Sequence, residues 1–245
     1  MLRLFLVIIF LLIFFIVSIP LLVIEWLISL IKPDFIKRRF VYAWVQTTFK
    51  IIYFIAGVKL KLINLDNIPK DEPVLFVGNH QSHFDTILTY ANLPNLTGFV
   101  SKIEIKRVPL LSWFMIYMNC VFLDRNDIRQ GIIAINKSIE LIEKGISVFI
   151  YPEGTRNPNP DEFLEFAKGS FKIAQRTNCP IVPVACVGSR SIFEDQMPLL
   201  KKGDVSIEFG KPFRFSELDA EQKKTVNVYT ADIIYKMYHN IKDSN

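Results

Sequence analysis

The chain begins with a long run of apolar positions and changes only later to short alternating patterns. Residues Leu4 to Ile24 carry no charge and are interrupted only by Ser18 and Pro20. About 20 residues at a rise of about 1.5 Å each are enough to cross the hydrocarbon core of a bilayer. The pattern therefore predicts a membrane-associated helix at the start of the chain.

A cleaved signal peptide is the competing interpretation of this run. No small-x-small cleavage site follows the run around Glu25 and Trp26, so we expect the segment to be retained. Only Arg3 and the amino terminus carry positive charge before it, whereas several basic residues follow it. The positive-inside rule then places the rest of the chain on the cytoplasmic side of the cell inner membrane. The basic residues that follow are Lys32, Lys37, Arg38 and Arg39.

A second apolar and aromatic stretch, Phe40 to Ala56, carries a cluster of polar residues. Clustered polar positions are typical of a helix that lies in the membrane interface rather than crossing it. Two arrangements follow from the pattern. One is a single span with a surface helix, and the other is a hairpin that enters one leaflet, with Pro20 kinking its first arm.

From Gly57 onward short apolar runs alternate with helical periods. The expected strands are Val58 to Leu62, Val74 to Val77, Gly98 to Val100, Val121 to Leu123, Ser147 to Tyr151, Ile181 to Cys186 and Val205 to Phe209. The expected helices are Thr86 to Ala91, Leu110 to Met118, Ile128 to Lys144, Gly169 to Arg176 and Ser216 to Ile241.

This alternation predicts an α/β fold with a mostly parallel sheet flanked by helices. We divide the chain into residues 1–56, the hydrophobic membrane-anchoring helices, and residues 57–245, a single α/β domain. In such a sheet the catalytic groups belong in the loops at the carboxyl ends of the strands.

Composition narrows the possible partners. The chain has 245 residues, 51% of them hydrophobic, and a formal charge of +5, but its Lys and Arg residues are scattered. This argues against nucleic-acid binding and favours an anionic bilayer or anionic substrates. The three cysteines form no CxxC pair, so we expect neither a disulfide framework nor a zinc cluster, and we expect no metal and no cofactor.

The first candidate chemistry follows the expected strand that ends at Val77. His80 lies there, and Asp85 follows five residues later, where the first turn of a helix can bring its carboxylate back to the imidazole. An aspartate bonded to one ring nitrogen fixes the tautomer of a histidine that acts as general base. Two other interpretations stay open: Ser82-x-x-Asp85 is also a capping-box pattern, and His83 is an alternative partner for the aspartate.

The second candidate element runs from Tyr151 to Arg156, where another strand enters a Pro/Gly turn. Gly154 lets the backbone approach a ligand, Thr155 offers a hydroxyl, and Arg156 brings a planar fork that suits a phosphate. The alternative is an exposed turn without function. Lys102 and Arg125 follow two further strands. Together these residues would form a strongly positive rim, suited to a phosphate-bearing lipid and a phosphate-rich donor.

The two elements together resemble the paired signature of the lysophosphatidic acid acyltransferase family. Asn79 to Asp85 is similar to the NHxxxxD box of these glycerolipid acyltransferases, and Tyr151 to Arg156 is similar to their FPEGTR box. Weaker similarities lie between and after the boxes, and the resemblance covers Gly57 to Lys211. The segments that carry them are Ser101 to Glu104, Val108 to Leu110, Val121 to Arg125, Phe166 to Phe171 and Ile181 to Ala185.

The resemblance implies a catalytic dyad of His80 and Asp85. It also implies an acceptor site at the second box, with Arg156 on the acceptor phosphate; the residues that we assign to this site are Lys102, Arg125, Glu153, Gly154, Thr155 and Arg156. Three positions depart from the family pattern. Asn119 stands for a usual glycine, Tyr151 for the usual Phe, and Asn157 for the usual Ser.

We therefore expect a membrane enzyme that moves a fatty acyl group from acyl-CoA or acyl carrier protein to the free sn-2 hydroxyl of lysophosphatidic acid, giving phosphatidic acid. We expect backbone donors between Gly78 and Ser82, and at the following helix start, to hold the oxyanion. The alternatives are transfer to another lysophospholipid or an aminoacyl lyso-lipid, a membrane-anchored lipid hydrolase that uses the same dyad on water, and a binding module without activity.

Overall fold

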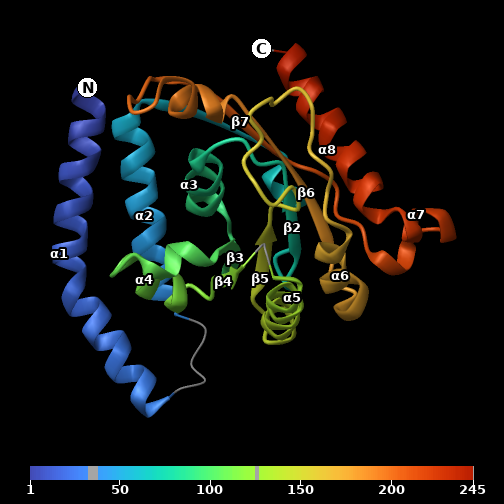
Figure 1. Ribbon diagram of the computed structural model, residues 1–245, viewed down its shortest axis with the longest axis horizontal. Coiled ribbons are helices and arrows are strands. Elements are labelled where there is room, and N and C mark those ends of the chain that lie inside the picture. The colour runs from blue at the N-terminus through green and yellow to red at the C-terminus, as the bar shows by residue number, and fades with distance from the viewer. Residues whose placement is uncertain (33–37, 125–126, 245) are drawn as a thin grey trace.

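The computed structural model of the protein describes residues 1–32, 38–124 and 127–244. Within these residues the strands form one seven-stranded sheet in the order β1-β7-β6-β2-β5-β3-β4 (Figure 1). The strands are β1 (Val58–Ile63), β2 (Leu75–Gly78), β3 (Thr97–Lys102), β4 (Val121–Leu123), β5 (Ser147–Ile150), β6 (Ile181–Val187) and β7 (Gly203–Phe209).

The central strands of this sheet all point the same way. β2 pairs in parallel with β5 and β6, β3 pairs in parallel with β5 and β4, and β1 pairs in parallel with β7. The β6–β7 pair is antiparallel. The carboxyl ends of β2, β3, β5 and β6 therefore meet at one edge of the sheet, which is where a largely parallel sheet positions its functional loops. The predicted fold class is confirmed.

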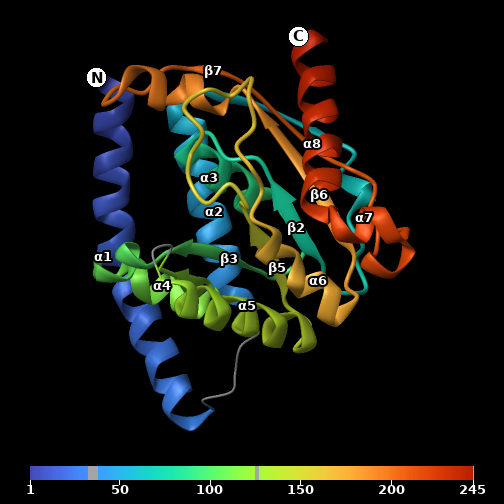
Figure 2. The same cartoon turned by 45° about the vertical axis from the view of Figure 1, so that its right-hand side comes forward.

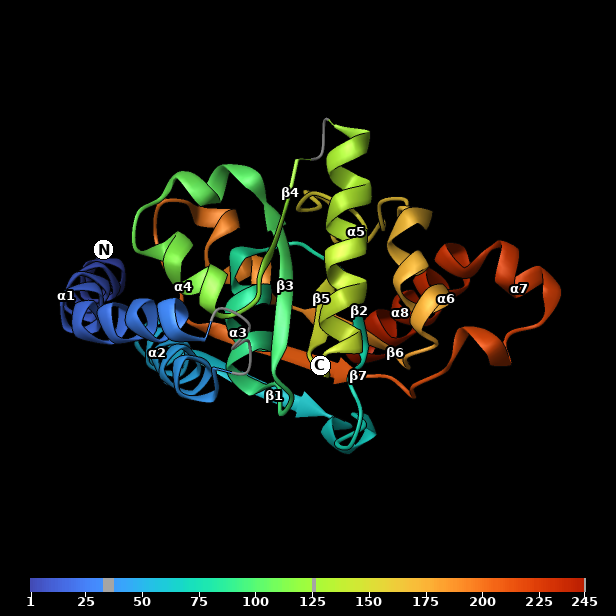
Figure 3. The same ribbon diagram turned by 90° about the horizontal axis from the view of Figure 1, so that it is seen from below.

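Helices cover both faces of the sheet (Figure 3). One face packs against α2, α3 and α4, with α1 outside them, and the other face packs against α5, α6 and α8. The helices are α1 (Leu2–Ile31), α2 (Arg39–Ala56), α3 (His83–Asn92), α4 (Leu111–Tyr117), α5 (Ile128–Glu143), α6 (Lys172–Thr177), α7 (Ala220–Lys224) and α8 (Val226–Asp243).

The apolar strands of the centre are explained by this double cover. Phe76 and Phe149 point to the α2–α3 face, and their rings stack with centroids 5.8 Å apart. Their neighbours Leu75 and Val148 point to the α5–α8 face, and all four side chains are fully buried. Because both faces are buried, these strands are continuous apolar runs and do not alternate with polar residues.

The first two helices run side by side in opposite directions (Figures 1 and 2). The Trp44 indole N–H donates to the Ser18 hydroxyl at 2.9 Å, and Arg38 forms a buried ion pair with Glu25. Pro20 lies inside α1, which remains one helix through it. α1 and α2 therefore form an antiparallel pair, and both membrane arrangements that the sequence left open stay predictions.

α1 exposes most of its apolar residues, and among the described helices it is the one that is long and apolar enough to cross a membrane. α2 instead shares the core of the sheet domain. Its Tyr42 hydroxyl donates to the Met118 carbonyl at 2.8 Å, and its Gln46 amide donates to the Leu93 carbonyl at 2.9 Å. The division at residue 57 stays a prediction, and α2 is firmly packed against the second of the two parts.

The strands lie where the sequence predicts them, and the helix boundaries differ more. α3 begins at His83, three residues before the expected start, because Ser82 serves as its N-cap. The helix expected from Ser216 to Ile241 is divided into α7 and α8 around Thr225. The one expected from Gly169 begins as a 3₁₀ turn and becomes α6.

Asn119, which stands for the glycine of the family pattern that the sequence resembles, has a φ of +58°. Glycine adopts this left-handed conformation freely, and asparagine is among the residues that tolerate it best. The substitution is therefore compatible with the turn between α4 and β4. Its carbonyl oxygen lies so close to Gly98 that a Cβ at residue 98 would collide with it.

Gly98→Ala should destabilise the protein by about 1–3 kcal/mol, because the new methyl group meets the backbone of Asn119, which cannot move aside without displacing the start of β4. Gly131→Ala is the matched control: Gly131 lies in α5 with no heavy atom within 4 Å of the added carbon. There the same change should stabilise by about 0.5–1 kcal/mol through helix propensity. The apparent unfolding midpoints of the two variants are measured in the same detergent. Equal midpoints would contradict the close approach of the Asn119 carbonyl to Gly98.

Candidate active site

Asp85 is a fully buried carboxylate at the start of α3. Its Oδ2 atom accepts the backbone N–H groups of Gln81 and Ser82, each at 2.7 Å, and its Oδ1 atom accepts the Ser189 hydroxyl. A buried carboxylate needs such donors to remain charged. The bond to Ser82 completes a capping box, so the capping interpretation of Asp85 is confirmed.

The same carboxylate also holds His80. The His80 Nδ1 atom lies 3.0 Å from Asp85 Oδ2, and the imidazole side chain is 14% exposed. Because Asp85 accepts, the ring proton is on Nδ1, and Nε2 carries a lone pair with no hydrogen-bond partner among the described residues. His83 bonds to a different carboxylate, so His80 is the histidine that pairs with Asp85.

The ring of Tyr151 fixes the plane of this imidazole. The two rings stack with centroids 4.1 Å apart and planes 15° from parallel. Tyr151 follows β5, and its ring is in turn packed against Phe149 at 4.8 Å. An aromatic ring of Phe shape serves this stacking equally well, so the Tyr in place of the family's Phe keeps the contact.

Asn79 fixes the start of the loop that carries His80. Its amide oxygen accepts the backbone N–H of Cys186 at 2.8 Å, and its amide N–H donates to the Cys186 carbonyl at 3.0 Å. Gln81 donates to the same carbonyl. The loop after β2 is therefore bonded on both sides of His80 to the backbone of β6.

The turn after β5 holds the backbone of His80. The His80 N–H donates to Glu153 Oε1 at 2.7 Å, and the His80 carbonyl accepts the N–H of Asn157 at 2.7 Å. The other oxygen of Glu153 is buried and has no partner within the described part of the chain. Burial, with a contribution from the charge of Asp85, raises the pKa of Glu153 to about 7, against the opposing effect of the His80 N–H.

Between Glu153 and Asn157 the turn is open. Gly154 has a φ of +70° and no heavy atom within 4 Å of a Cβ built on it, and Thr155 is exposed. The Arg156 side chain is 39% exposed. The turn that the sequence predicts as an approach for a ligand is therefore sterically accessible and lies beside His80.

Arg156 belongs to a cluster at the start of α3. Its guanidinium lies against the His83 ring, with Nη1 3.5 Å from Glu194 Oε1. Glu194 also accepts the His83 N–H at 2.8 Å, contacts His83 Nδ1 at 2.9 Å and accepts the Ser82 hydroxyl. Although burial opposes ionisation, these hydrogen bonds lower the pKa of Glu194 to about 2.

Lys102 lies at the end of β3 with its ammonium 2.8 Å from the Glu104 carboxylate, and both side chains are about half exposed. Arg125, the other cation assigned to this rim from the sequence, lies outside the described residues, and its role stays a prediction. The described cations Lys102 and Arg156 are each paired with a carboxylate. The strongly positive rim that the sequence suggests is therefore partly neutralised.

The oxyanion donors expected in the loop after β2 are already in use. The backbone N–H groups from His80 to Phe84 all donate to side-chain oxygens of the protein, which belong to Ser82, Asp85, Glu153 and Glu194. The expectation is therefore wrong for these groups, because the sequence pattern does not reveal that neighbouring carboxylates and the cap occupy them.

Ser189 and Glu194 are site residues that sequence reasoning missed. Both follow the carboxyl end of β6, which lies at the same edge of the sheet as the ends of β2 and β5, and the segments after β5 and β6 rise beyond this edge (Figure 2). Their residue types give no signal by themselves. The rule that loops after parallel strands form the site, applied to the loop after Val187, would have found them.

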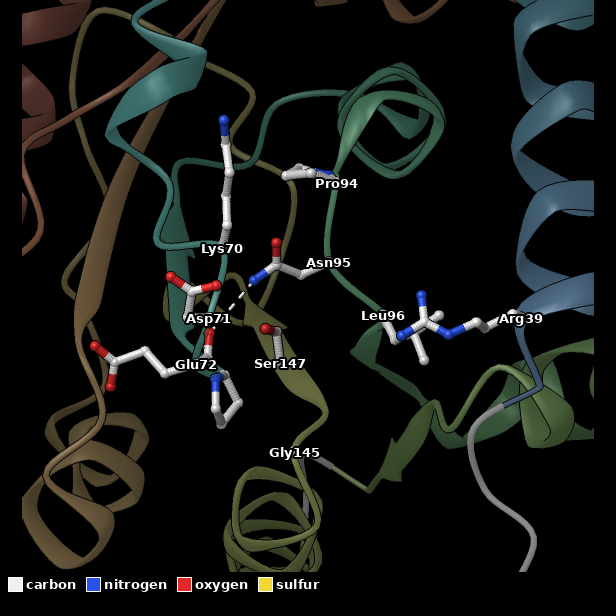
Figure 4. Close-up of a pocket in the computed structure, with 10 residues that line it drawn as sticks. Arg39, Lys70, Asp71, Glu72, Pro94, Asn95, Leu96, Gly145 and Ser147 are labelled. Atoms are coloured by element: carbon white, nitrogen blue, oxygen red, sulfur yellow. Dashed lines mark hydrogen bonds between the residues drawn. The ribbon is translucent and has the colours of Figure 1, made fainter.

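A pocket of about 260 Å³ lies at the opposite edge of the sheet (Figure 4). Its lining residues include Glu72, Leu96 and Ser147, which lie at or just before the starts of β2, β3 and β5. The pocket is therefore separate from His80 and Asp85. Among the described residues no group of three or more His, Cys, Asp and Glu side chains could hold a metal ion.

Comparisons with known proteins identify the family of this chain. The acyltransferase family model matches residues 59–187. A probable 1-acyl-sn-glycerol-3-phosphate acyltransferase of Mycoplasma genitalium is 34% identical over 229 residues, which cover 87% of this chain and 81% of the relative. The chloroplastic 1-acyl-sn-glycerol-3-phosphate acyltransferase BAT2 of Brassica napus is 34% identical over 76% of this chain.

This chain spans about half the length of the chloroplastic relatives from Brassica napus and Arabidopsis thaliana. A crystal structure of the 1-acyl-sn-glycerophosphate (LPA) acyltransferase PlsC from Thermotoga maritima has the same fold, with a TM-score of 0.73 over 98% of both chains and 23% identity. With a family model that matches more than half of its residues, and a relative 34% identical over most of both lengths, the chain belongs to the acyltransferase family.

Proposed function

We propose that this protein transfers a fatty acyl group from an acyl thioester to the free sn-2 hydroxyl of lysophosphatidic acid, giving phosphatidic acid. The observation that carries the proposal is the bonded pair of His80 and Asp85, with Nε2 of the imidazole unoccupied among the described residues. Relatives named as 1-acyl-sn-glycerol-3-phosphate acyltransferases, at 27–34% identity, support the choice of acceptor.

In this mechanism Asp85 orients His80 and stabilises the imidazolium that forms during the reaction. Nε2 takes the proton of the acceptor hydroxyl while that oxygen attacks the thioester carbonyl. The tetrahedral intermediate collapses, the carbon–sulfur bond breaks, and the proton on His80 passes to the thiolate of coenzyme A or acyl carrier protein. The acyl group moves directly from donor to acceptor, so the enzyme needs no serine or cysteine nucleophile.

The acceptor phosphate is assigned to the turn after β5. Arg156 offers a fork of N–H donors that can bind two phosphate oxygens, and Gly154 and Thr155 leave its approach open. Lys102 and Arg125 complete the proposed site. Glu153 accepts the backbone N–H of His80 and so fixes the position of the loop after β2. We assign it to the substrate site for this reason as well as for its own carboxyl group.

The acceptor's acyl chain lies in a bilayer, so the hydroxyl reaches His80 only if the domain is held at the headgroup level. We propose that α1 and α2 hold it there, on the cytoplasmic face of the cell inner membrane. The exposed apolar residues of α1 support this, since they have no protein partner to cover them and are typical of contact with lipid.

His80→Ala should reduce acyl transfer by about 10²- to 10⁴-fold, because the general base is lost while Asp85 keeps its backbone donors. The assay gives purified protein lysophosphatidic acid and a labelled acyl thioester, and resolves the products by mass. Phosphatidic acid is the expected product of the unsubstituted protein. Labelled free fatty acid as the sole product would instead favour the hydrolase.

The matched control is His239→Ala. His239 is a partly exposed residue of α8 whose ring contacts the Tyr235 carbonyl, far along the chain from both sequence boxes, and the substitution should leave turnover unchanged. His83 lies against Arg156 and Glu194, so it is not a suitable control. Near-normal turnover of His80→Ala would rule out the dyad.

Arg156→Ala should raise the KM for lysophosphatidic acid more than the KM for the acyl donor, because the guanidinium is assigned to the acceptor phosphate. Arg156→Lys should recover only part of the loss, since lysine keeps the charge but not the planar fork. Arg176→Ala, an exposed arginine of α6 bonded to Asn136, controls for the lost charge. An increase in the KM for the acyl donor alone would contradict this assignment and would place the guanidinium at the donor instead.

Deletion of residues 1–31 should lower activity on bilayer-embedded acceptor far more than on a short-chain, water-soluble analogue, because α1 is removed and α2 with its core contacts is kept. Parallel assays on vesicles and on the soluble analogue measure the ratio. An unrelated membrane anchor fused in place of α1 should restore bilayer activity only in part. Equal losses on the two substrates would show that α1 supports the fold instead.

A further inference from the structure

Glu194 is a buried carboxylate beside the dyad that the mechanism above does not use. Its side chain is 7% exposed, and it comes from the loop after β6. It forms hydrogen bonds with the His83 backbone N–H, the His83 ring and the Ser82 hydroxyl. Arg156 Nη1, which also lies against the His83 ring, forms an ion pair with it at 3.5 Å. The first three groups belong to the N-terminus of α3, and Arg156 belongs to the turn after β5.

The partners of Glu194 differ in how firmly the fold holds them. Ser82 and His83 are already part of a capped helix, so their donors give Glu194 a fixed position. Arg156 is long and 39% exposed, and it follows Thr155 on an open turn. A fixed anion beside a flexible cation orders the cation. The Glu194 side chain is 7% exposed and the Arg156 side chain is 39% exposed, so we take Glu194 as the fixed group and Arg156 as the group that it positions.

We propose that Glu194 is a positioning residue that holds the Arg156 guanidinium through Nη1 and leaves its other N–H donors directed to the acceptor phosphate. This role rests on the proposed function. It makes Glu194 a determinant of acceptor affinity that contacts neither substrate. It also couples the two sequence boxes, since the carboxylate joins the helix that begins beside the dyad to the turn that binds the headgroup.

Ordering a long side chain before the ligand arrives removes part of the entropy lost on binding. Removal of the negative charge should therefore raise the KM for lysophosphatidic acid by about 3- to 10-fold, which is the usual worth of one ordered side chain. The turnover number should change by less than about twofold, because His80 and Asp85 keep their contacts. The KM for the acyl donor should not change.

The test substitution is Glu194→Gln, which keeps the size of the side chain and an oxygen that accepts the His83 N–H. Asp195→Asn is the matched control, because it removes the same charge from the next residue, which pairs with Arg190 and is 48% exposed. Both variants are made in the full chain and in an Arg156→Ala background. For each, kcat and both KM values are measured in the same detergent micelles, together with the unfolding midpoint.

We expect Glu194→Gln to raise the KM for the acceptor and Asp195→Asn to leave it unchanged. In the Arg156→Ala background, Glu194→Gln should have no further effect on this KM. A lowered acceptor KM would overturn the proposal, since it would mean that the carboxylate competes with the phosphate. An equal effect in both backgrounds, or a fall in kcat with the unfolding midpoint, would also overturn it and indicate a structural role.

Arg156→Ala separates this inference from the proposed function. An unchanged acceptor KM in Arg156→Ala would overturn the assignment of the phosphate to Arg156 and with it the role of Glu194. A raised KM in Arg156→Ala with an unchanged KM in Glu194→Gln would overturn the positioning role alone and leave the proposed function standing.

Discussion

The site depends on one buried carboxylate, Asp85. Without donors, burying a charged carboxylate is strongly unfavourable, and here the backbone of residues 81–82, the Ser189 hydroxyl and His80 all converge on it. These donors come from the loop after β2 and the loop after β6. The carboxylate that caps α3 is therefore the same one that orients the imidazole, so the helix start and the geometry of the proposed dyad depend on one side chain.

Much of this could be predicted from the sequence because it is local. His80 and Asp85 are five residues apart, within one turn and one helix start, so their spacing allows them to meet, although it left His83 open as the partner. The strands could be predicted because a sheet covered on both faces requires continuous apolar runs. The order of strand and helix along the chain then predicted a parallel sheet with its loops at one edge.

The parts that could not be predicted are those in which distant residues meet. Glu194 lies 111 residues beyond His83, and no local pattern shows that its side chain turns back to the start of α3. Two of the occupied backbone donors after β2, those of His80 and His83, were missed for the same reason, because their acceptors Glu153 and Glu194 are distant in sequence. Helix boundaries also escaped prediction where a cap or a break decides them, as at Ser82 and Thr225, because a single side chain outweighs the apolar period.

Charge at this site is arranged in pairs and not as an open positive rim. Lys102 and Glu104 are about half exposed, so their attraction is weak and an arriving phosphate can exchange for the carboxylate at little cost. Glu194 is buried and bonded to the backbone of α3, so its attraction to Arg156 is less screened and its position is fixed. A phosphate that replaced Glu194 would have to replace several hydrogen bonds. A phosphate that bound the remaining donors of Arg156 would leave these hydrogen bonds in place. In the proposed function, affinity for the headgroup then depends on where the guanidinium is held more than on the net charge around it.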